Sequence, residues 1–210
     1  GKDYLGYPEV WGRTRRLKLI QDSLAVLGKD FCVVLAPSGP EFYPEYLPDY
    51  VHRAKRDSNN YDSFLRAFAD AGLNYVDMNQ WFKDMRGRKE HSLWPQAGVH
   101  WSVYGQFLAG DSLISLVEHE RGTNLKSLVI DSVSYMSPKL GDFDAGEAAN
   151  LMWNHAASEM AYPIHHYEED GPKGKARVLF ISDSFFWGLY NNLGLPYQVF
   201  DEGDFWYYNQ

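Results

Sequence analysis

Residues 177–193 read RVLFISDSFFWGLYNNL, and the fold class follows from this stretch. Its first part, Arg177 to Ile181, is short and nearly all apolar, which is typical of a fully buried strand in a parallel sheet. A helix is predicted for Phe185 to Leu193, directly after the strand. Ser184 stands at the junction, so its hydroxyl is expected in the crevice beyond the carboxyl end of the strand, where open parallel sheets bind ligands.

The same alternation of helix and strand extends over the rest of the chain. Apolar side chains at helical spacing predict helices, and short apolar runs predict strands. The predicted helices cover about 14–27, 61–68, 79–85 and 102–121, and the predicted strands 31–36, 74–78 and 128–133. Residues 134–175 show no clear period apart from a helix around 146–153. We therefore predict an α/β fold in one domain, 1–210, built as a three-layer sandwich of flavodoxin-like type with a mostly parallel central sheet.

Charge and composition exclude several classes of protein. The formal net charge is −8 and no basic stripe is present, so nucleic-acid binding is not expected. The single cysteine, Cys32, can form no internal disulfide and is predicted to be a buried thiol on a strand. No apolar run reaches the ~18 residues of a membrane span. The chain opens at Gly1 without a methionine, and we expect a targeting or anchoring segment to precede it in the natural protein.

Aromatic residues are abundant, with 15 tyrosines, 12 phenylalanines and 7 tryptophans. Such side chains build cores and their rims, and they also stack on sugar rings. Two interpretations follow from this surplus, namely an aromatic-rich core and a surface that faces carbohydrate.

Ser184 and His100 are the candidate reactive pair. The backbone N–H groups that follow Ser184 lie where a developing oxyanion can be held, as a nucleophilic serine requires. His100 stands at the end of a loop, ahead of a helix for which Ser102 is the predicted N-cap, and its imidazole can take the proton of the serine. Ser and Asp are also ordinary helix N-caps, so the junction around Ser184 has a purely structural interpretation as well.

No metal site is predicted. Most of the other histidines are expected on the surface, and no His, Asp or Glu cluster shows the spacing of a zinc site. The pair His165-His166 has only a weak case as metal ligands. Residues 142–147 contain acidic residues and a glycine but are too short for a calcium loop, so we interpret them as a turn.

A proline-rich segment, residues 36–48 (APSGPEFYPEYLP), follows one of the predicted strands. Prolines make this loop stiff, and its aromatic side chains are able to line a groove for a substrate. A rigid surface loop without a ligand is an equally open interpretation.

Three segments in this order, 43–48, 98–102 and 182–185, resemble the SGNH-hydrolase-like domain of the alginate O-acetyltransferase family. In that family a Tyr-Pro-Glu-Tyr-Leu-Pro-like stretch comes first, an Asp-x-His-Trp motif second, and a Gly-Asp-Ser motif near the C-terminus. The Ser and His motifs are thus in swapped order relative to ordinary SGNH esterases. The resemblance extends over about 31–209 and implies an SGNH-like version of the predicted fold.

The resemblance also implies acyl transfer. Ser184 would accept an acetyl group and pass it to a hydroxyl of a cell-envelope or secreted polysaccharide. His100 would act as general base and acid, and the Ser184 backbone N–H would contribute to the oxyanion hole. Transferase and acetylesterase share the first half-reaction, so both stay open. The expected substrate-binding residues are Ser38, Tyr43, Tyr46 and Trp101.

The same resemblance implies the partners and the location of the protein. No cofactor and no metal is expected, and the substrate would be a polysaccharide. An acetyl-donor protein or a membrane partner would supply the acyl group, and the location would be periplasmic or otherwise extracytoplasmic.

Two departures from the family pattern concern the site. Gly98 stands where the family has the Asp that orients the imidazole, and Asp77 and Asp183 are the candidate replacements. Gly39 stands where relatives are expected to have a basic residue. If no carboxylate orients His100, the alternative function is a catalytically impaired carbohydrate-binding or scaffold domain on the same fold.

Overall fold

The structure is a computed structural model that describes residues 4–53, 58–150, 158–168, 176–201 and 203–208. Contacts between residues divide the chain into two compact units. The first comprises Gly1–Ala36 and Tyr43–Gln80, and the second comprises Pro37–Phe42 and Trp81–Gln210. The single domain expected over the whole chain stays a prediction.

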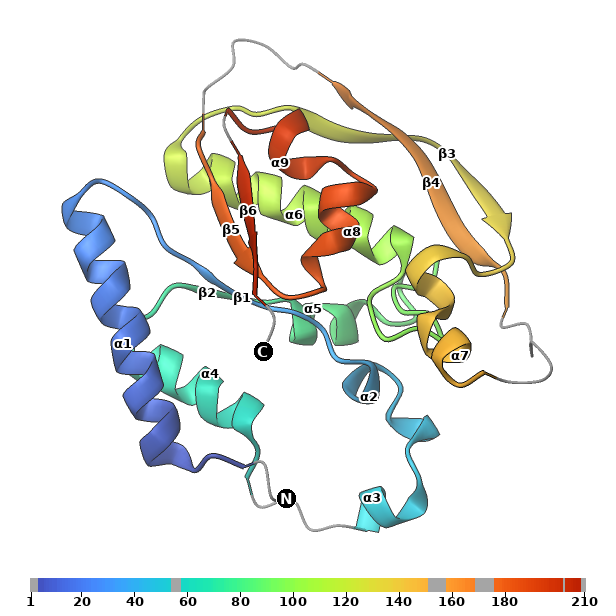
Figure 1. Ribbon diagram of the computed structural model, residues 1–210, viewed down its shortest axis with the longest axis horizontal. Coiled ribbons are helices and arrows are strands. Elements are labelled where there is room, and N and C mark those ends of the chain that lie inside the picture. Colours follow the sequence, from blue (N-terminus) through green and yellow to red (C-terminus); the bar gives the residue numbers. More distant parts are fainter. Residues whose placement is uncertain (1–3, 54–57, 151–157, 169–175, 202, 209–210) are drawn as a thin grey trace. The chain divides into compact units, whose positions relative to one another are not determined.

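In the described part of the first unit, β1 (Val33–Leu35) and β2 (Tyr75–Asp77) form a parallel pair. The helix α1 packs on α4, and the two lie side by side in Figure 1. The helical segments of this unit are α1 (Tyr7–Val26), η1 (Pro44–Tyr46), α3 (Asp49–Arg53) and α4 (Asn60–Ala71). Both strands were predicted, although each is shorter than its apolar run.

The ends of α4 follow from its sequence. The side chain of Asn59 caps the N-terminus, because its Oδ1 atom accepts a hydrogen bond from the Asp62 backbone N–H at 2.7 Å. Gly72 follows the last turn with a φ of 64°, the left-handed conformation that commonly ends a helix. A proline in the first turn of α1 favours a start at Tyr7, which is earlier than the predicted residue 14.

The second unit is built around the long helix α6 (Val103–Arg121), which packs against α8, β3 and β4. The hydroxyl of Ser102 caps α6 by accepting a hydrogen bond from the Gly105 N–H at 2.9 Å, as predicted. The other helical segments of this unit are α2 (Gly39–Phe42), η2 (Leu140–Phe143), α7 (Asp144–Ala148), α8 (Phe186–Asn191) and α9 (Leu195–Gln198). The short helix α5 (Met78–Met85) contains the point in the sequence where the first unit gives way to the second.

The strands of the second unit form two separate pairs. β3 (Ser127–Met136) and β4 (Met160–Glu168) are antiparallel, and β5 (Leu179–Ser182) and β6 (Asp204–Tyr207) are parallel. Figure 1 shows β3 and β4 as the longest ribbons of the sheet structure. The described strands therefore pair two by two, and their hydrogen bonds do not form the mostly parallel central sheet that we predicted. The three-layer sandwich stays a prediction.

The sequence failed to predict β4 because its pattern is irregular. Only its second half alternates between half-buried and exposed residues, and it contains Pro163, which lacks an N–H for a sheet ladder and suits an edge strand. The helix expected around 146–153 is present as α7 at its start, and residues 151–153 lie outside the described part of the chain. Residues 142–147, interpreted as a turn, form the end of η2 and most of α7.

None of the helices in the described ranges combines the length and the apolar character that a membrane-spanning helix needs.

Candidate active site

Ser184 lies in the turn between β5 and α8, at the junction predicted from the sequence. Asp183 shapes this turn, because its Oδ1 atom accepts a hydrogen bond from the Phe185 N–H at 3.0 Å. The Ser184 carbonyl accepts a hydrogen bond from the Trp187 N–H at 3.2 Å, which starts the helical turn. Ser184 therefore lies between the end of strand β5 and the start of helix α8.

His100 comes from the loop that leads into α6. Its Nε2 atom lies 2.9 Å from the Oγ atom of Ser184, although the two residues are 84 positions apart in the chain. The ring of Phe185 packs edge-on against the imidazole, with ring centroids 5.0 Å apart, and fixes its orientation. The His100 side chain is 24% exposed, so a reactant can approach the pair.

Asp144, the first residue of α7, occupies the other side of the imidazole. Its Oδ2 atom lies 2.8 Å from His100 Nδ1. Its Oδ1 atom accepts hydrogen bonds from the Val99 N–H at 2.6 Å and from the Ala145 N–H at 2.8 Å. The carboxylate is thus held by backbone groups on both neighbouring segments, and it points at His100.

Gly98 explains why the carboxylate comes from another segment. A Cβ atom at this position would overlap the ring of Pro95 and lie 2.9 Å from the Gly141 carbonyl oxygen. The Gly98 carbonyl also accepts a hydrogen bond from the Trp94 indole N–H at 3.2 Å. Position 98 therefore has no room for an aspartate side chain, and Asp144 lies against Nδ1 instead.

The two carboxylates proposed from the sequence as replacements are engaged elsewhere. Asp77 accepts hydrogen bonds within the first unit, from the Tyr61 hydroxyl at 2.6 Å and from the Gln80 N–H at 2.9 Å. Asp183 bonds to the backbone of its own turn. Sequence reasoning missed Asp144 because no local pattern marks a bond between residues 44 positions apart.

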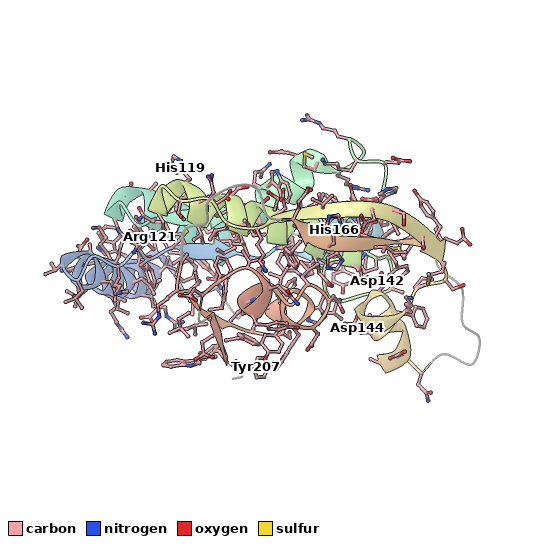
Figure 2. The ribbon with its side chains drawn as sticks, turned by 90° about the horizontal axis from the view of Figure 1, so that it is seen from above. His119, Arg121, Asp142, Asp144, His166 and Tyr207 are labelled. Carbon is pink, nitrogen blue, oxygen red and sulfur yellow. The ribbon has the colours of Figure 1, made fainter. Side chains whose placement is uncertain are left out.

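Asp142 precedes Asp144 by two residues, and both are labelled in Figure 2. Its side chain is fully buried, and its Oδ1 atom accepts a hydrogen bond from the Val103 N–H at the start of α6 at 3.2 Å. Burial raises the pKa of Asp142 to about 6, and the charge of Asp144 adds to this rise, while the Tyr162 hydroxyl and the Val103 N–H oppose it. The η2–α7 segment is thus tied to the chain on either side of His100.

Trp101, an expected substrate-binding residue, lies inside the second unit. Its side chain is 3% exposed and packs on the ring of Phe185, with centroids 5.6 Å apart, and on that of Phe82. It therefore supports the Ser184 turn from the interior and offers little surface to a substrate.

Ser38, a second expected substrate-binding residue, starts the short helix α2. Its carbonyl accepts hydrogen bonds from the N–H groups of Glu41 and Phe42. At the next position, a Cβ atom on Gly39 would come 3.0 Å from Trp94 Nε1. A basic side chain there would press on the Trp94 ring, so the glycine fits its surroundings.

Tyr43 and Tyr46, the other two candidates, belong to the first unit. Their rings lie 5.2 Å apart, and Tyr46 is 60% exposed. Tyr46 ends η1, and Tyr43, which is half-buried, directly precedes it; their role in binding stays a prediction.

A metal has no evident place in the described parts of the chain. Among those residues, no group of three or more His, Cys, Asp or Glu side chains is arranged to hold an ion. His166 is instead paired with Asp131, with 2.9 Å between Nδ1 and Oδ1. Burial lowers the pKa of the neighbouring His165.

The bonded series Asp144–His100–Ser184 has the geometry of a general-base-assisted nucleophile. A carboxylate on Nδ1 keeps the proton on that nitrogen, so Nε2 is free to accept the proton of the serine hydroxyl. The same carboxylate stabilises the imidazolium that then forms. The arrangement can therefore activate a serine for attack on an ester carbonyl.

A comparison with protein families gives a match over residues 7–179 to the family described as "SGNH hydrolase-like domain, acetyltransferase AlgX". The matched residues include His100 and Asp144 and end before Ser184. A comparison with curated protein sequences gives no significant match.

Three solved structures share the fold of this chain. The O-acetyltransferase domain of Pseudomonas putida AlgJ has a TM-score of 0.58 at 18% identity, covering 97% of this chain and 71% of that one. Pseudomonas aeruginosa AlgX has a TM-score of 0.58 at 18% identity, and the match covers 92% of this chain but 48% of AlgX. Bacillus cereus PatB1 with a sulfonyl adduct has a TM-score of 0.60 at 10% identity, covering 96% and 89%. The chain therefore has the SGNH-like fold.

Proposed function

This chain belongs to the family of SGNH hydrolase-like domains of the AlgX acetyltransferase type, and from that premise we propose that it transfers acetyl groups to or from polysaccharide hydroxyls through Ser184. The observation that carries the proposal is the bonded series of Asp144, His100 and Ser184, with heavy-atom distances of 2.8 Å and 2.9 Å. Asp144 supplies the carboxylate that the sequence pattern lacks at Gly98.

In the first half-reaction, Ser184 Oγ attacks the carbonyl carbon of an acetyl ester while His100 Nε2 takes the hydroxyl proton. The C–O bond to the leaving alcohol breaks, and the imidazolium returns the proton to that alcohol. The acetyl group is then an ester of Ser184. Asp144 stabilises the imidazolium in both proton transfers, and the Ser184 backbone N–H is proposed as one donor to the oxyanion.

In the second half-reaction, His100 takes the proton of an acceptor hydroxyl, whose oxygen attacks the acetyl carbonyl. The bond to Ser184 Oγ breaks, and the serine recovers its proton from the imidazolium. A sugar acceptor makes the protein a transferase and water makes it an esterase. The family favours the transferase, and neither half-reaction requires a cofactor.

The alternative of an impaired binding or scaffold domain depended on the missing aspartate at position 98. The position of Asp144 removes that reason, so we favour the enzyme. By analogy with the family we also propose an extracytoplasmic location, with a donor protein or membrane partner supplying the acetyl group.

A sulfonyl fluoride tests the activated serine, since a sulfonyl adduct is present in the PatB1 structure. We expect intact-protein mass spectrometry to show one adduct on the wild type and none on Ser184→Ala or His100→Ala. Ser182→Ala, two residues away, is the matched control and should label like the wild type. An adduct that persists on folded Ser184→Ala would refute the assignment of the nucleophile.

A further inference from the structure

A hollow of about 240 Å³ lies within the second unit, beside the helix that follows Ser184. Its walls come from α8, α9 and β6, which are drawn together in orange to red in Figure 1. Among the described residues that line it, the aromatic ones are Trp187, Tyr190, Tyr197 and Phe205, and the others are Pro196, Gly203 and Asp204. Neither the mechanism proposed above nor the segments that carry the family resemblance use this hollow.

The aromatic rings are held in place by one another. Trp187 packs edge-on against Phe205 and Tyr190, with centroids 5.0 Å and 5.8 Å away, and Tyr190 packs against Tyr197 at 5.9 Å. Even so, Trp187 is 39% exposed and Tyr197 is 60% exposed. Rigid, solvent-exposed rings of this kind lose little entropy on binding and can stack on the apolar face of a pyranose ring.

The hollow is linked to the candidate active site through Trp187, which is close to Ser184 in the sequence. Trp187 is three residues after Ser184, and its backbone N–H donates a hydrogen bond to the Ser184 carbonyl. This link is the reason for assigning the hollow to the same polysaccharide that would reach Ser184.

The charge of the lining restricts the kind of polysaccharide. Among the described residues that line the hollow there is no lysine or arginine, and the charged group among them is the Asp204 carboxylate, which accepts hydrogen bonds from the Phe205 N–H and the Trp206 indole N–H. The chain as a whole carries a net charge of −8. An acidic polysaccharide such as alginate would bring its carboxylates towards Asp204, and like charges repel.

From these observations we infer that the hollow of α8, α9 and β6 is an acceptor subsite for a neutral, pyranose-based polysaccharide. Trp187 and Tyr197 are the stacking residues, and Asp204 accepts hydrogen bonds from sugar hydroxyls. The inference rests on the proposed function, because it assigns the acceptor of the same reaction.

Calorimetric titration tests it with two probes, a cello-oligosaccharide and an oligomannuronate of equal length. The Ser184→Ala protein is used, so that binding is measured without turnover. We expect the neutral oligomer to bind and the acidic one to bind at least tenfold more weakly. Trp187→Ala and Tyr197→Ala should each weaken binding of the neutral oligomer roughly tenfold, the loss of one stacked ring.

Tyr135→Ala is the matched control. Tyr135 lies on β3, is 52% exposed, packs its ring on His91 and is not part of the lining of the hollow. Its removal should change the affinity less than twofold. Equal binding of the two oligomers, or unchanged affinity in both hollow variants, would overturn the inference.

Sulfonyl labelling of Ser184 distinguishes failure of this inference from failure of the proposed function. The wild-type chain should give one adduct, and this measurement does not use the hollow or its variants. If the wild type labels normally but shows no preference for the neutral oligomer, only the subsite is refuted. If the wild type does not label at all, the proposal of Ser184 as nucleophile is refuted.

Discussion

At the scale of single residues, a carboxylate reaches the imidazole from an unexpected position. The family motif has its aspartate two residues before the histidine, where this chain has Gly98. A side chain at 98 would meet Pro95 and the Gly141 carbonyl, and Asp144 provides the carboxylate across 44 residues of sequence. The chemical requirement, a carboxylate on Nδ1, is thus met by a different residue.

Asp144→Asn should lower the rate of acetyl-ester hydrolysis by roughly 10³- to 10⁴-fold, since an amide no longer holds the tautomer that leaves Nε2 free. The rate of p-nitrophenyl acetate hydrolysis measures this effect, with circular dichroism to show that the variant folds. A loss below tenfold would mean that Asp144 does not orient His100.

Gly98→Asp tests the steric argument in the Asp144→Asn background. Because a side chain at 98 overlaps Pro95, the added aspartate should restore none of the lost rate and should lower stability further. Recovery of activity in the double variant would show that position 98 has room after all.

The pKa of Asp142, raised by burial to about 6 from an ordinary 3.8, predicts a pH-dependent stability. The folded state holds this proton more tightly than the unfolded state. The stabilisation of the folded state by protonated Asp142 is therefore complete below the unfolded-state pKa of 3.8. It is lost as the pH rises through the folded-state pKa of about 6. Asp142→Asn keeps an acceptor for the Val103 N–H and carries no charge, so it should be more stable than the wild type at neutral pH, by up to about 3 kcal/mol.

Denaturant unfolding across that pH range measures the difference between Asp142→Asn and the wild type. The gap in unfolding free energy should shrink as the pH falls from about 6 towards about 4. A gap that does not change with pH would show that Asp142 does not titrate in this range.

At the scale of elements, the buried side chain of Gln106 links helix α6 to the end of helix α8 by hydrogen bonds. The Gln106 amide donates from Nε2 to the Trp101 carbonyl at 3.2 Å and accepts at Oε1 from the Asn192 side chain at 2.7 Å. Gly188 of α8 faces this amide so closely that a Cβ atom would overlap it. Since both ends of the amide are bonded, it cannot move aside without loss.

Gly188→Ala should therefore destabilise the protein by about 1–3 kcal/mol, the usual cost of overpacking, and should slow sulfonyl labelling by shifting the Ser184 turn. Gly12→Ala is the matched control, because Gly12 also lies in a helix but a Cβ atom there meets nothing within 4 Å. It should be neutral or stabilise by about 0.5–1 kcal/mol. Equal effects of the two substitutions in denaturant unfolding would argue against this interlock.

At the scale of the whole molecule, the negative net charge of the protein repels any negatively charged polymer near it. With a net charge of −8, long-range repulsion slows the approach of a polyanion, and salt screens that repulsion. Weak binding of oligomannuronate should thus improve between about 0.01 M and 0.15 M salt, while binding of a neutral oligomer stays constant. Calorimetry at the two ionic strengths checks this, and polyanion binding that weakens with salt would contradict it.

Much of the molecule could be predicted without coordinates. The strand-to-helix junction at Ser184, the capped helix after His100 and the strands at β1, β2 and β3 all follow from hydrophobic period and capping residues. These signals are local, since they depend on neighbours within one or two turns of the chain.

Strand pairing and the third member of the site could not be predicted in this way. Which strands bond to one another, and that Asp144 lies against His100 while Gly98 excludes a side chain, depend on contacts between residues far apart in sequence. Local propensity carries no information about such contacts, because they form only when the packed elements bring their ends together. Sequence therefore sufficed to predict an SGNH-like fold and to single out Ser184 and His100, whereas the mostly parallel sheet stays unconfirmed and only the tertiary structure brings the Asp144 carboxylate to the His100 imidazole.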